Sequence, residues 1–333
     1  MIISRTPFRI SFFGGGTDYP VWYNEHSGSV ISVAINKYCF ITARQLPPFF
    51  KYKYRIRYYK REEVNDVSEI RHSSVKECLK FLGIEKGIEI VHHADLPALS
   101  GIGSSSTFTV GLLNALYALK GYMPTKKELA NNAIHVEQDL IGESVGSQDQ
   151  AITAFGGLNR IDFGGHENVI VRPLIIKKER LNDLQNYLML FFTGFSRRAS
   201  EIASEQIKVT PSKSKELNIM MEILEEAYII LRSKSSNIDD FGKLLNEQWR
   251  IKRSITKKIS NHKIDEIYDA GIRAGAHGGK LLGAGGGGFI LFYVKPELQG
   301  AVKKKLRHLL HVPFRFNYTG SQIIYYSHDD NIS

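Results

Sequence analysis

The 333-residue sequence contains only two cysteines, Cys39 and Cys78. Two isolated cysteines provide neither a disulfide framework nor a Cys-x-x-Cys metal signature, so we expect a reducing, cytoplasmic environment. Long apolar runs are also missing: no stretch approaches the ~20 residues of a membrane span. Arg5, Pro7 and Arg9 interrupt the apolar start that a signal peptide would need. We therefore predict no membrane partner.

Acidic residues are outnumbered, because 34 Asp and Glu face 44 Lys and Arg and leave a formal net charge of +10. Such a balance suits nucleic acids, anionic surfaces or phosphorylated small molecules. The most basic segment, residues 51–61, alternates aromatic and cationic side chains. Alternate residues of a strand face opposite sides, so this pattern predicts a half-buried strand with a solvated basic face. A basic nucleic-acid-binding protein stays an alternative, but no recognition helix or zinc finger supports it, and we predict no nucleic-acid partner.

With 43% hydrophobic residues, the chain is able to bury a substantial core. Strand patterns fill the first 60 residues and helical spacings dominate the second half, without a regular βαβ alternation. This predicts an α+β fold in two domains, 1–166 and 167–333, divided near the glycine-rich segment 162–166. The predicted helices are 73–82, 107–119, 125–141, 217–231, 238–259, 264–276 and 296–310. The predicted strands include 30–35, 88–92, 187–192, 289–294 and 314–318. Thr125 and Glu128 form a capping-box pattern at the start of one helix.

A glycine-rich segment, PALSGIGSSS at residues 97–106, has no lysine, which excludes a Walker A loop. Its glycines let the backbone approach a ligand closely, and its serines begin the helix that follows. The N–H groups and the positive dipole end of a helix N-terminus bind anions. The serines are equally suited to capping that helix, so both roles stay open. The candidate phosphate-binding residues are Gly101, Ile102, Gly103, Ser104, Ser105 and Ser106.

A second glycine cluster, GAGGGG at residues 283–288, formally matches the dinucleotide fingerprint G-x-G-x-x-G. That fingerprint requires a strand before it and a helix after it. Here a helical pattern comes before and the strand FILFYV comes after. A dinucleotide-dependent oxidoreductase is therefore disfavoured, and we expect a glycine turn that packs against a narrow neighbour.

Two further clusters contain carboxylates. In FGGGTD, residues 13–18, three glycines follow a strand that carries Arg9 and place Asp18 on a tight turn. Glu137, on a predicted helix, precedes Asp149, on a glycine-containing loop, by twelve residues. A carboxylate pair of this kind is able to bind Mg²⁺ and to abstract a proton. Taken singly, each of these residues also fits an ordinary turn, cap or surface charge.

Together, these motifs resemble the GHMP kinases, the family named for galactokinase, homoserine kinase, mevalonate kinase and phosphomevalonate kinase. The N-terminal segment 6–19, the P-x-x-x-G-x-G-S-S loop at 97–105 and the glycine motif at 283–288 occur in the family's order. The resemblance implies an N-terminal domain like ribosomal protein S5 domain 2 and a ferredoxin-like C-terminal domain. It also implies an ATP-dependent phosphotransferase with an alcohol acceptor that uses Mg²⁺.

The resemblance also implies roles for individual residues. Asp149 would be the catalytic base, helped by Arg9, while Ser105 and Glu137 would hold Mg²⁺. The loop residues Gly101 to Ser106 would surround the ATP phosphates. The substrate would contact Gly15, Gly16, Thr17, Asp18, Gly285 and Gly286.

The expected substrate follows from the positions at which this sequence differs from some members of the family and resembles others. Galactokinases carry Gly-Glu-His before Thr-Asp-Tyr, whereas this chain has Gly14–Gly16, which disfavours galactose. The combination of FGGGTD, GIGSSS, GSQDQ and TGFSRRASEI resembles the members that act on D-glycero-D-manno-heptose 7-phosphate. This implies phosphorylation of the anomeric O1 to give the 1,7-bisphosphate for nucleotide-heptose and surface-glycan synthesis. A fucose- or mannose-type sugar is the alternative, and the sequence does not indicate an oligomeric state.

A substrate that already carries a phosphate requires a cationic pocket. Arg197 and Arg198, which follow a buried strand pattern, are the predicted phosphate-binding residues. Surface arginines at the start of a helix would give the same pattern.

Overall fold

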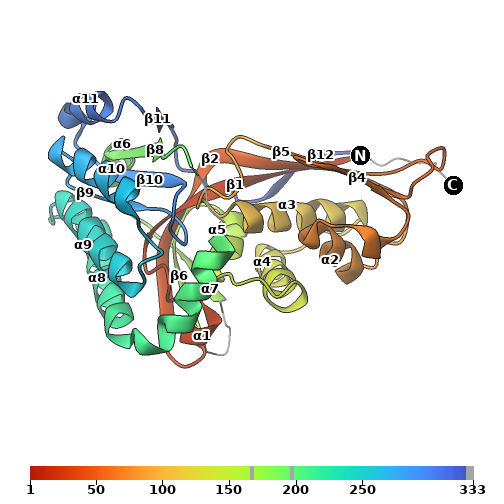
Figure 1. Cartoon of the computed structure of the whole chain (residues 1–333), viewed down its shortest axis with the longest axis horizontal. Helices are drawn as coiled ribbons and strands as arrows, with labels where there is room; N and C mark the ends of the chain where they lie inside the picture. Colours follow the sequence, from red (N-terminus) through yellow and green to blue (C-terminus); the bar gives the residue numbers. More distant parts are fainter. Residues whose placement is uncertain (166–168, 196–198, 328–333) are drawn as a thin grey trace.

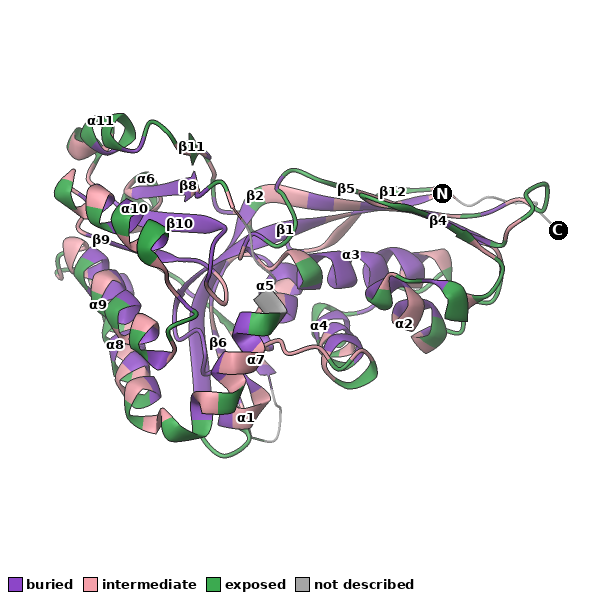
Figure 2. Ribbon diagram, viewed as in Figure 1, coloured by how far each residue is buried: buried purple, intermediate pink, exposed green. Residues whose placement is uncertain are grey.

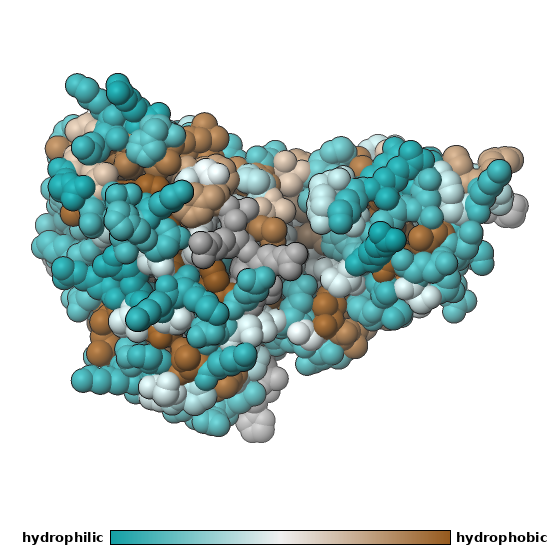
Figure 3. Space-filling view, in the orientation of Figure 1, coloured by the Kyte–Doolittle hydropathy of each residue, from teal (hydrophilic) through white to brown (hydrophobic). Residues whose placement is uncertain are grey.

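The computed structural model describes residues 1–165, 169–195 and 199–327. The molecule is elongated and has two lobes (Figure 1). Strand β1 (Ile2–Phe13) and strand β2 (Gly28–Gln45) run through the middle of the molecule, and the N-terminal Met1 lies beside Ser327, the last described residue. The face seen in Figure 3 is mostly hydrophilic, with separate hydrophobic patches. Within the described residues, no helix combines the length and the apolar character needed to cross a membrane.

The larger sheet is built around β2, which is long enough to pair with different strands along its length. Its first part pairs with β6 (Leu158–Phe163) and its last part with β5 (Ile88–Ala94), while β1 lies antiparallel along its other edge. The register of β1 against β2 shifts between Pro7 and Arg9. The remaining strands are β3 (Tyr54–Arg57), β4 (Arg61–Val64), β7 (Val169–Pro173) and β12 (Gln322–Tyr326), in the order β12-β1-β2-β5-β3-β4 with β7 on β6.

One face of this sheet is covered by helices. Helix α3 (Ser104–Leu119) packs on β1 and β2, and nearly every one of its side chains is buried (Figure 2). Its apolar sequence has little one-sided character because the sheet and the other helices enclose it. The capping box predicted at Thr125 and Glu128 is present. The other helices of this lobe are α1 (Pro20–Tyr23), α2 (Ser73–Phe81), α4 (Lys126–His135), a π-helical turn (Val136–Leu140) and α5 (Gln148–Phe155).

The second lobe has its own antiparallel sheet, in the order β11-β8-β10-β9. Its strands are β8 (Leu188–Phe192), β9 (Gly278–Leu281), β10 (Phe289–Tyr293) and β11 (Leu310–His311). Its helices are α6 (Lys178–Asn186), α7 (Ala199–Val209), α8 (Ser214–Arg232), α9 (Asp239–Ile255), α10 (His262–Arg273) and α11 (Pro296–Lys305). The two lobes share one apolar core, in which Phe12 and Phe13 of β1 contact the ring of Phe241 on α9 edge-on.

Three sequence expectations are wrong in detail. Residues 314–318 form no regular strand and make a single bridge, between Phe316 and Ile35. The glycines at 283–288 join two strands, β9 and β10, and not a helix and a strand. The basic face of residues 51–61 is not uniformly solvated, because Arg55 is buried and its Nε lies 2.6 Å from the Glu89 carboxylate.

The domain boundary at 166/167 stays a prediction. Strands β7 and β12 both come after this boundary in the sequence and both belong to the larger sheet. The chain therefore returns to its first lobe at its C-terminal end, where β12 pairs with β1.

Candidate active site

A cleft of about 760 Å³, counted out to open solvent, lies where the two lobes meet. Segments far apart in the sequence line it. They are the turn after β1, the glycine loop at 99–106, residues 144–149, Ala203 of α7, Lys252 of α9 and residues 283–284. All four of the sequence motifs therefore converge on one cavity, together with two helices from the second lobe.

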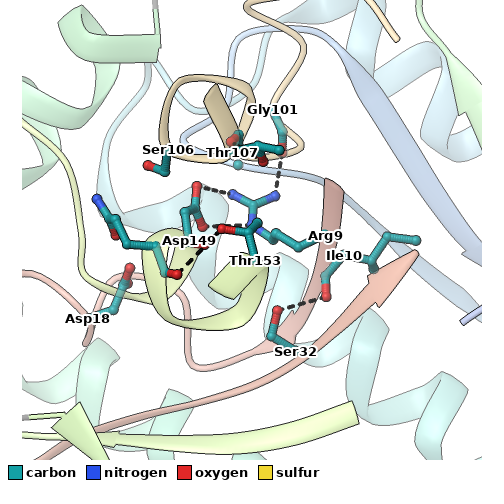
Figure 4. A network of polar contacts seen from close by, with 12 residues as sticks. Arg9, Ile10, Asp18, Ser32, Gly101, Ser106, Thr107, Asp149 and Thr153 are labelled. Carbon is teal, nitrogen blue, oxygen red and sulfur yellow. Dashed lines mark hydrogen bonds and ion pairs between the residues drawn. The ribbon is translucent and has the colours of Figure 1, made fainter. Parts of the chain in front are cut away.

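Arg9 and Asp149 form an ion pair in this cleft (Figure 4). The Arg9 Nε and Nη2 atoms each donate to one Asp149 carboxylate oxygen at 2.7 Å, a bidentate geometry that fixes both side chains. Nη1 of Arg9 donates to the carbonyl of Gly101 at 2.8 Å. Arg9 is buried, whereas the Asp149 side chain keeps 21% of its surface exposed. Asp149 therefore faces the cleft and Arg9 ties it to the glycine loop.

The glycine loop takes a backbone shape that few residues allow. Leu99, Gly101 and Gly103 have φ angles of 58°, 79° and 77°, and Leu99 is the only non-glycine residue with positive φ among the described residues. A Cβ at Gly101 would lie 2.4 Å from the Leu282 carbonyl oxygen, and a Cβ at Gly103 would lie 3.1 Å from the Asp149 Oδ2. The glycines thus let the loop pack between the second lobe and the ion pair.

The serines after the loop contact a buried glutamate and do not cap the helix. Gly103 is the N-cap of α3, and no side chain caps it. Ser106 Oγ donates to Glu137 at 2.7 Å, and Ser105 Oγ donates to the same carboxylate at 3.3 Å. Thr109 and Gln150 also donate to Glu137. The sequence left open whether these serines cap α3, and in the structure no side chain caps this helix.

Glu137 is fully buried on the π-helical turn. Burial raises the pKa of its carboxyl group to about 7, against the lowering effect of its hydrogen bonds. The nearby Glu143 also raises this pKa. A buried carboxylate in contact with hydroxyl groups beside the glycine loop fits a hard cation such as Mg²⁺.

Within the described chain, no cluster of three or more His, Cys, Asp or Glu is placed to hold a metal ion. Mg²⁺ characteristically uses one or two protein carboxylates together with substrate phosphates, so Glu137 and Ser105 fit a metal that arrives with a nucleotide. The unpartnered, buried Ser104 Oγ, beside them on α3, is one more oxygen available to such a ligand.

Asp18 lies across the cleft from the glycine loop. The N–H of Gly16 donates to its Oδ1 at 2.8 Å, and Gly146 makes room for it, since a Cβ there would lie 2.0 Å from Oδ2. Burial raises the pKa of Asp18, and the charge of Asp149 raises it further. The turn itself is fixed by Thr17, whose Oγ1 donates to the carbonyls of Gly14 and Ser29.

The remaining predicted residues lie at different distances from the cleft. Gly16 lines it, and a Cβ on Gly15 would lie 3.5 Å from Lys252 Nζ, whereas Ile102 is buried in the core. Gly285 and Gly286 pack against the backbone of Ile259, next to the lining residues Gly283 and Ala284. Arg197 and Arg198 fall outside the described residues.

Sequence reasoning missed three groups at the cleft. Lys252 lies on α9 between the buried residues Trp249 and Ile255. A lysine on an otherwise apolar helix face is the sequence feature that could have pointed to it. Gln148 and Gly146 flank the predicted base without any pattern that distinguishes them from ordinary loop residues.

Comparison with known proteins identifies the class. The family description "GHMP kinases N terminal domain" matches residues 72–157, and "GHMP kinases C terminal" matches residues 229–311. The chain is 30% identical to D-glycero-alpha-D-manno-heptose 7-phosphate kinase of Campylobacter jejuni, over 92% of this chain and 93% of that protein. It is 25% identical to the bifunctional fucokinase/GDP-fucose pyrophosphorylase of Arabidopsis thaliana, over 87% of this chain and 29% of that protein.

Among solved structures, a D-glycero-D-manno-heptose 1-phosphate kinase from Bacteroides thetaiotaomicron has the same fold. Its TM-score is 0.73 at 24% identity, over 98% of this chain and all of that one. The two-lobed mixed α/β fold is that of the GHMP kinases, which are phosphotransferases with an alcohol acceptor. The chain belongs to the GHMP kinases.

Proposed function

We propose that this kinase transfers the γ-phosphoryl group of ATP to the anomeric O1 of D-glycero-D-manno-heptose 7-phosphate. The product would be the 1,7-bisphosphate, an intermediate for nucleotide-heptose and surface-glycan synthesis in the cytoplasm. The observation that carries the chemistry is the Arg9–Asp149 pair, held 2.8 Å from the glycine loop by the bond to Gly101. The substrate assignment rests on the motif pattern and on the similarity to the heptose 7-phosphate kinase.

Asp149 is the proposed general base. Its partly exposed carboxylate opens onto the cleft, while the bidentate contact with Arg9 fixes its orientation. The hydroxyl that attacks ATP is anomeric and therefore more acidic than an ordinary alcohol, so a carboxylate is a sufficient base. Proton abstraction by Asp149 as O1 attacks in line would supply a factor of roughly 10²–10⁴.

The glycine loop and the start of α3 are the proposed phosphate site. Residues 101–106 would surround the ATP phosphates with backbone N–H groups, and the helix dipole would favour their negative charge. Ser105 and Glu137 would hold Mg²⁺, which supplies charge neutralisation to the phosphates when bound. Phosphoryl transfer depends mainly on such positioning and neutralisation.

The sugar is proposed to bind at the glycine turn. Asp18 would accept hydrogen bonds from sugar hydroxyls, and Gly15 and Gly16 would present backbone without side chains at the turn beside it. Gln148 lines the cleft with its Oε1 unpartnered, and Gln206 of α7 is buried with neither amide atom hydrogen bonded. Unsatisfied buried amides of this kind suit a ligand with many hydroxyl groups. Arg197 and Arg198 are proposed to bind the 7-phosphate.

A coupled assay of ADP release tests the assignment against a panel of acceptors. The panel contains D-glycero-D-manno-heptose 7-phosphate, the corresponding unphosphorylated heptose, fucose, mannose and mannose 6-phosphate. We expect kcat/KM for the heptose 7-phosphate to exceed that for each unphosphorylated sugar by at least about 10³, because a buried phosphate contact is lost without it. Preference for an unphosphorylated hexose would refute the heptose 7-phosphate assignment and would favour the fucose-type alternative.

A further inference from the structure

Lys252 is a buried cation in the cleft that the roles assigned above leave unused. Helix α9 carries it into the interior on the same face as Trp249 and Ile255, and only 5% of its surface is exposed. Its Nζ donates to the carbonyl of Gly283 at 2.9 Å. Lys252 lines the same cavity as Arg9, Asp18 and Asp149.

The position of Lys252 relative to the glycine loop is set by close backbone packing. A Cβ at Gly283, the residue whose carbonyl Lys252 contacts, would lie 2.6 Å from the Gly101 Cα. Gly101 in turn accepts the hydrogen bond from Arg9. Gly283 therefore lies between the Lys252 ammonium group and the glycine loop at 99–106, which contains no lysine.

The charge of Lys252 is not used by a protein partner. In the part of the chain that the structure describes, it makes no ion pair, and the Gly283 carbonyl engages only one of its three N–H donors. Arg9, by contrast, has its charge paired with Asp149 and also donates to the Gly101 carbonyl. A buried charge is costly unless it is paired, and an apolar side chain would fill the same space at lower cost. The geometry calls for an anionic ligand.

We propose that Lys252 is a catalytic residue of the phosphoryl transfer, which donates hydrogen bonds to the transferred phosphoryl group from the second lobe. The glycine loop would contact that group from one side and Lys252 from the other. The cation that a Walker loop carries within itself would here be supplied by a helix some 150 residues later, when the nucleotide lies between the lobes. The proposal rests on the kinase reaction and not on which sugar accepts the phosphoryl group.

The charged groups around Lys252 agree with this role. Burial is the main reason that the pKa of its ammonium group is lowered to about 8; the charge of Arg9 acts in the same direction, while Asp18 and Asp149 oppose it. Lys280 of β9 also interacts with it electrostatically, and burial lowers the pKa of Lys280 well below its ordinary value. Because the protonated form is the one that donates, activity should fall as the pH rises through the pKa of Lys252.

The test compares Lys252→Met and Lys252→Arg with Lys243→Met, an exposed lysine of the same helix that pairs with Asp240. We expect Lys252→Met to lower kcat by about 10²–10³, as for the loss of one preorganised donor. Its affinity for Mg²⁺-ADP should change less than about threefold, since ADP lacks the transferred group. The kcat of each variant is compared with that of the wild type on the panel acceptor that the wild type uses best. A wild type that does not phosphorylate the heptose would therefore count against the substrate assignment and not against the role of Lys252.

Two further readouts separate the proposed contact from a structural role. The wild type should bind Mg²⁺-ADP more tightly when aluminium fluoride is added as a mimic of the transferred group, and Lys252→Met should lose that gain. Lys252→Arg should retain part of kcat and lose the activity decline above pH 8, because arginine stays protonated there. Unchanged kcat in Lys252→Met, an equal loss of ADP affinity, or the same alkaline decline in Lys252→Arg would each overturn the proposal. If the Met variant does not fold, the pH profile of the Arg variant decides the question.

Discussion

At the scale of single residues, Asp149 and Glu137 are two carboxylates in contrasting surroundings. Asp149 is partly exposed and oriented by a guanidinium group, whereas Glu137 is fully buried beneath hydroxyl groups. The first arrangement suits a group that must meet a substrate proton. The second arrangement, that of Glu137, would suit a group that holds a metal ion.

Asp149→Asn keeps the size of the side chain and removes its ability to accept a proton. We expect kcat to fall by roughly 10²–10⁴, while the dissociation constant for Mg²⁺-ADP stays within a few-fold of wild type. Steady-state kinetics and calorimetric titration with ADP measure the two quantities. A variant with near-normal turnover would remove Asp149 from the role of base.

Ser105→Ala removes a hydroxyl group that lies 3.3 Å from Glu137. If this oxygen is a metal ligand, the Mg²⁺ concentration that gives half-maximal activity should rise by about tenfold or more. Thr107→Ser, on the same helix, is the matched control because its Oγ1 donates to the Gly103 carbonyl and not to Glu137. An unchanged Mg²⁺ dependence in Ser105→Ala would exclude Ser105 as a metal ligand.

Which residues meet in the cleft was only partly predictable from the sequence. Arg9, Ser105, Glu137 and Asp149 were found because each belongs to a motif with a recognisable spacing. Lys252 belongs to none: its place depends on how α9 packs against the first lobe, which local patterns do not encode. The same holds for the orphaned amides of Gln148 and Gln206.

At the scale of elements, the glycine loop depends on the close approach of two backbones. A Cβ at Gly101 would lie 2.4 Å from the Leu282 carbonyl oxygen, and a Cβ at Gly288 would lie 2.1 Å from the Ser100 carbonyl oxygen. The glycine cluster at 283–288, which matches a dinucleotide fingerprint in sequence, therefore packs against the glycine loop of the other lobe. The close packing against this loop, and not a nucleotide-binding motif, explains why the cluster consists of glycines.

Gly101→Ala tests this packing against Gly121→Ala. Both glycines have φ angles near +75° to +79°, but no atom lies within 4 Å of a Cβ at Gly121. Gly121→Ala should lower the free energy of unfolding by about 1–2 kcal/mol, the cost of the left-handed backbone alone. Gly101→Ala should cost more than this and also weaken Mg²⁺-ADP binding. Equal costs in denaturant unfolding, with ADP affinity unchanged, would contradict the close packing.

The helices and most strands followed their periodicity, but the elements that fail are informative. Residues 314–318 alternate like a strand, yet the chain there only bridges to Ile35 before it continues into β12. Arg55 alternates onto the expected solvent face and is buried because Glu89 on the neighbouring strand pairs with it. In both cases the tertiary neighbour overrides a correct local period.

At the scale of the whole molecule, the two lobes share an interior and not only a cleft. Lys280 of β9 is buried and donates to the carbonyl of Phe12 at 2.8 Å, which links the two sheets. Burial lowers its pKa well below the ordinary value for lysine, and the charge of Lys252 lowers it further. The folded protein therefore releases this proton at a lower pH than the unfolded chain.

This shift predicts how stability depends on pH. Between the folded and unfolded pKa values of Lys280, the unfolded chain binds more protons, so the free energy of unfolding rises with pH. The slope from this group is at most about 1.4 kcal/mol per pH unit. Comparing the wild type with Lys280→Met by denaturant unfolding from pH 8 to 10 isolates that slope, and Lys243→Met provides the surface control. Parallel pH profiles for the wild type and Lys280→Met would contradict the lowered pKa of this buried lysine.

The most direct test of the proposed reaction is phosphorus NMR of a mixture of this protein, Mg²⁺-ATP and D-glycero-D-manno-heptose 7-phosphate. The account predicts a new phosphomonoester resonance coupled to the anomeric proton, growing in step with ADP while the 7-phosphate resonance persists. Asp149→Asn should form the same product at a greatly reduced rate. No new resonance on the heptose, or phosphorylation at a position other than O1, in a preparation that phosphorylates another sugar of the panel would contradict it.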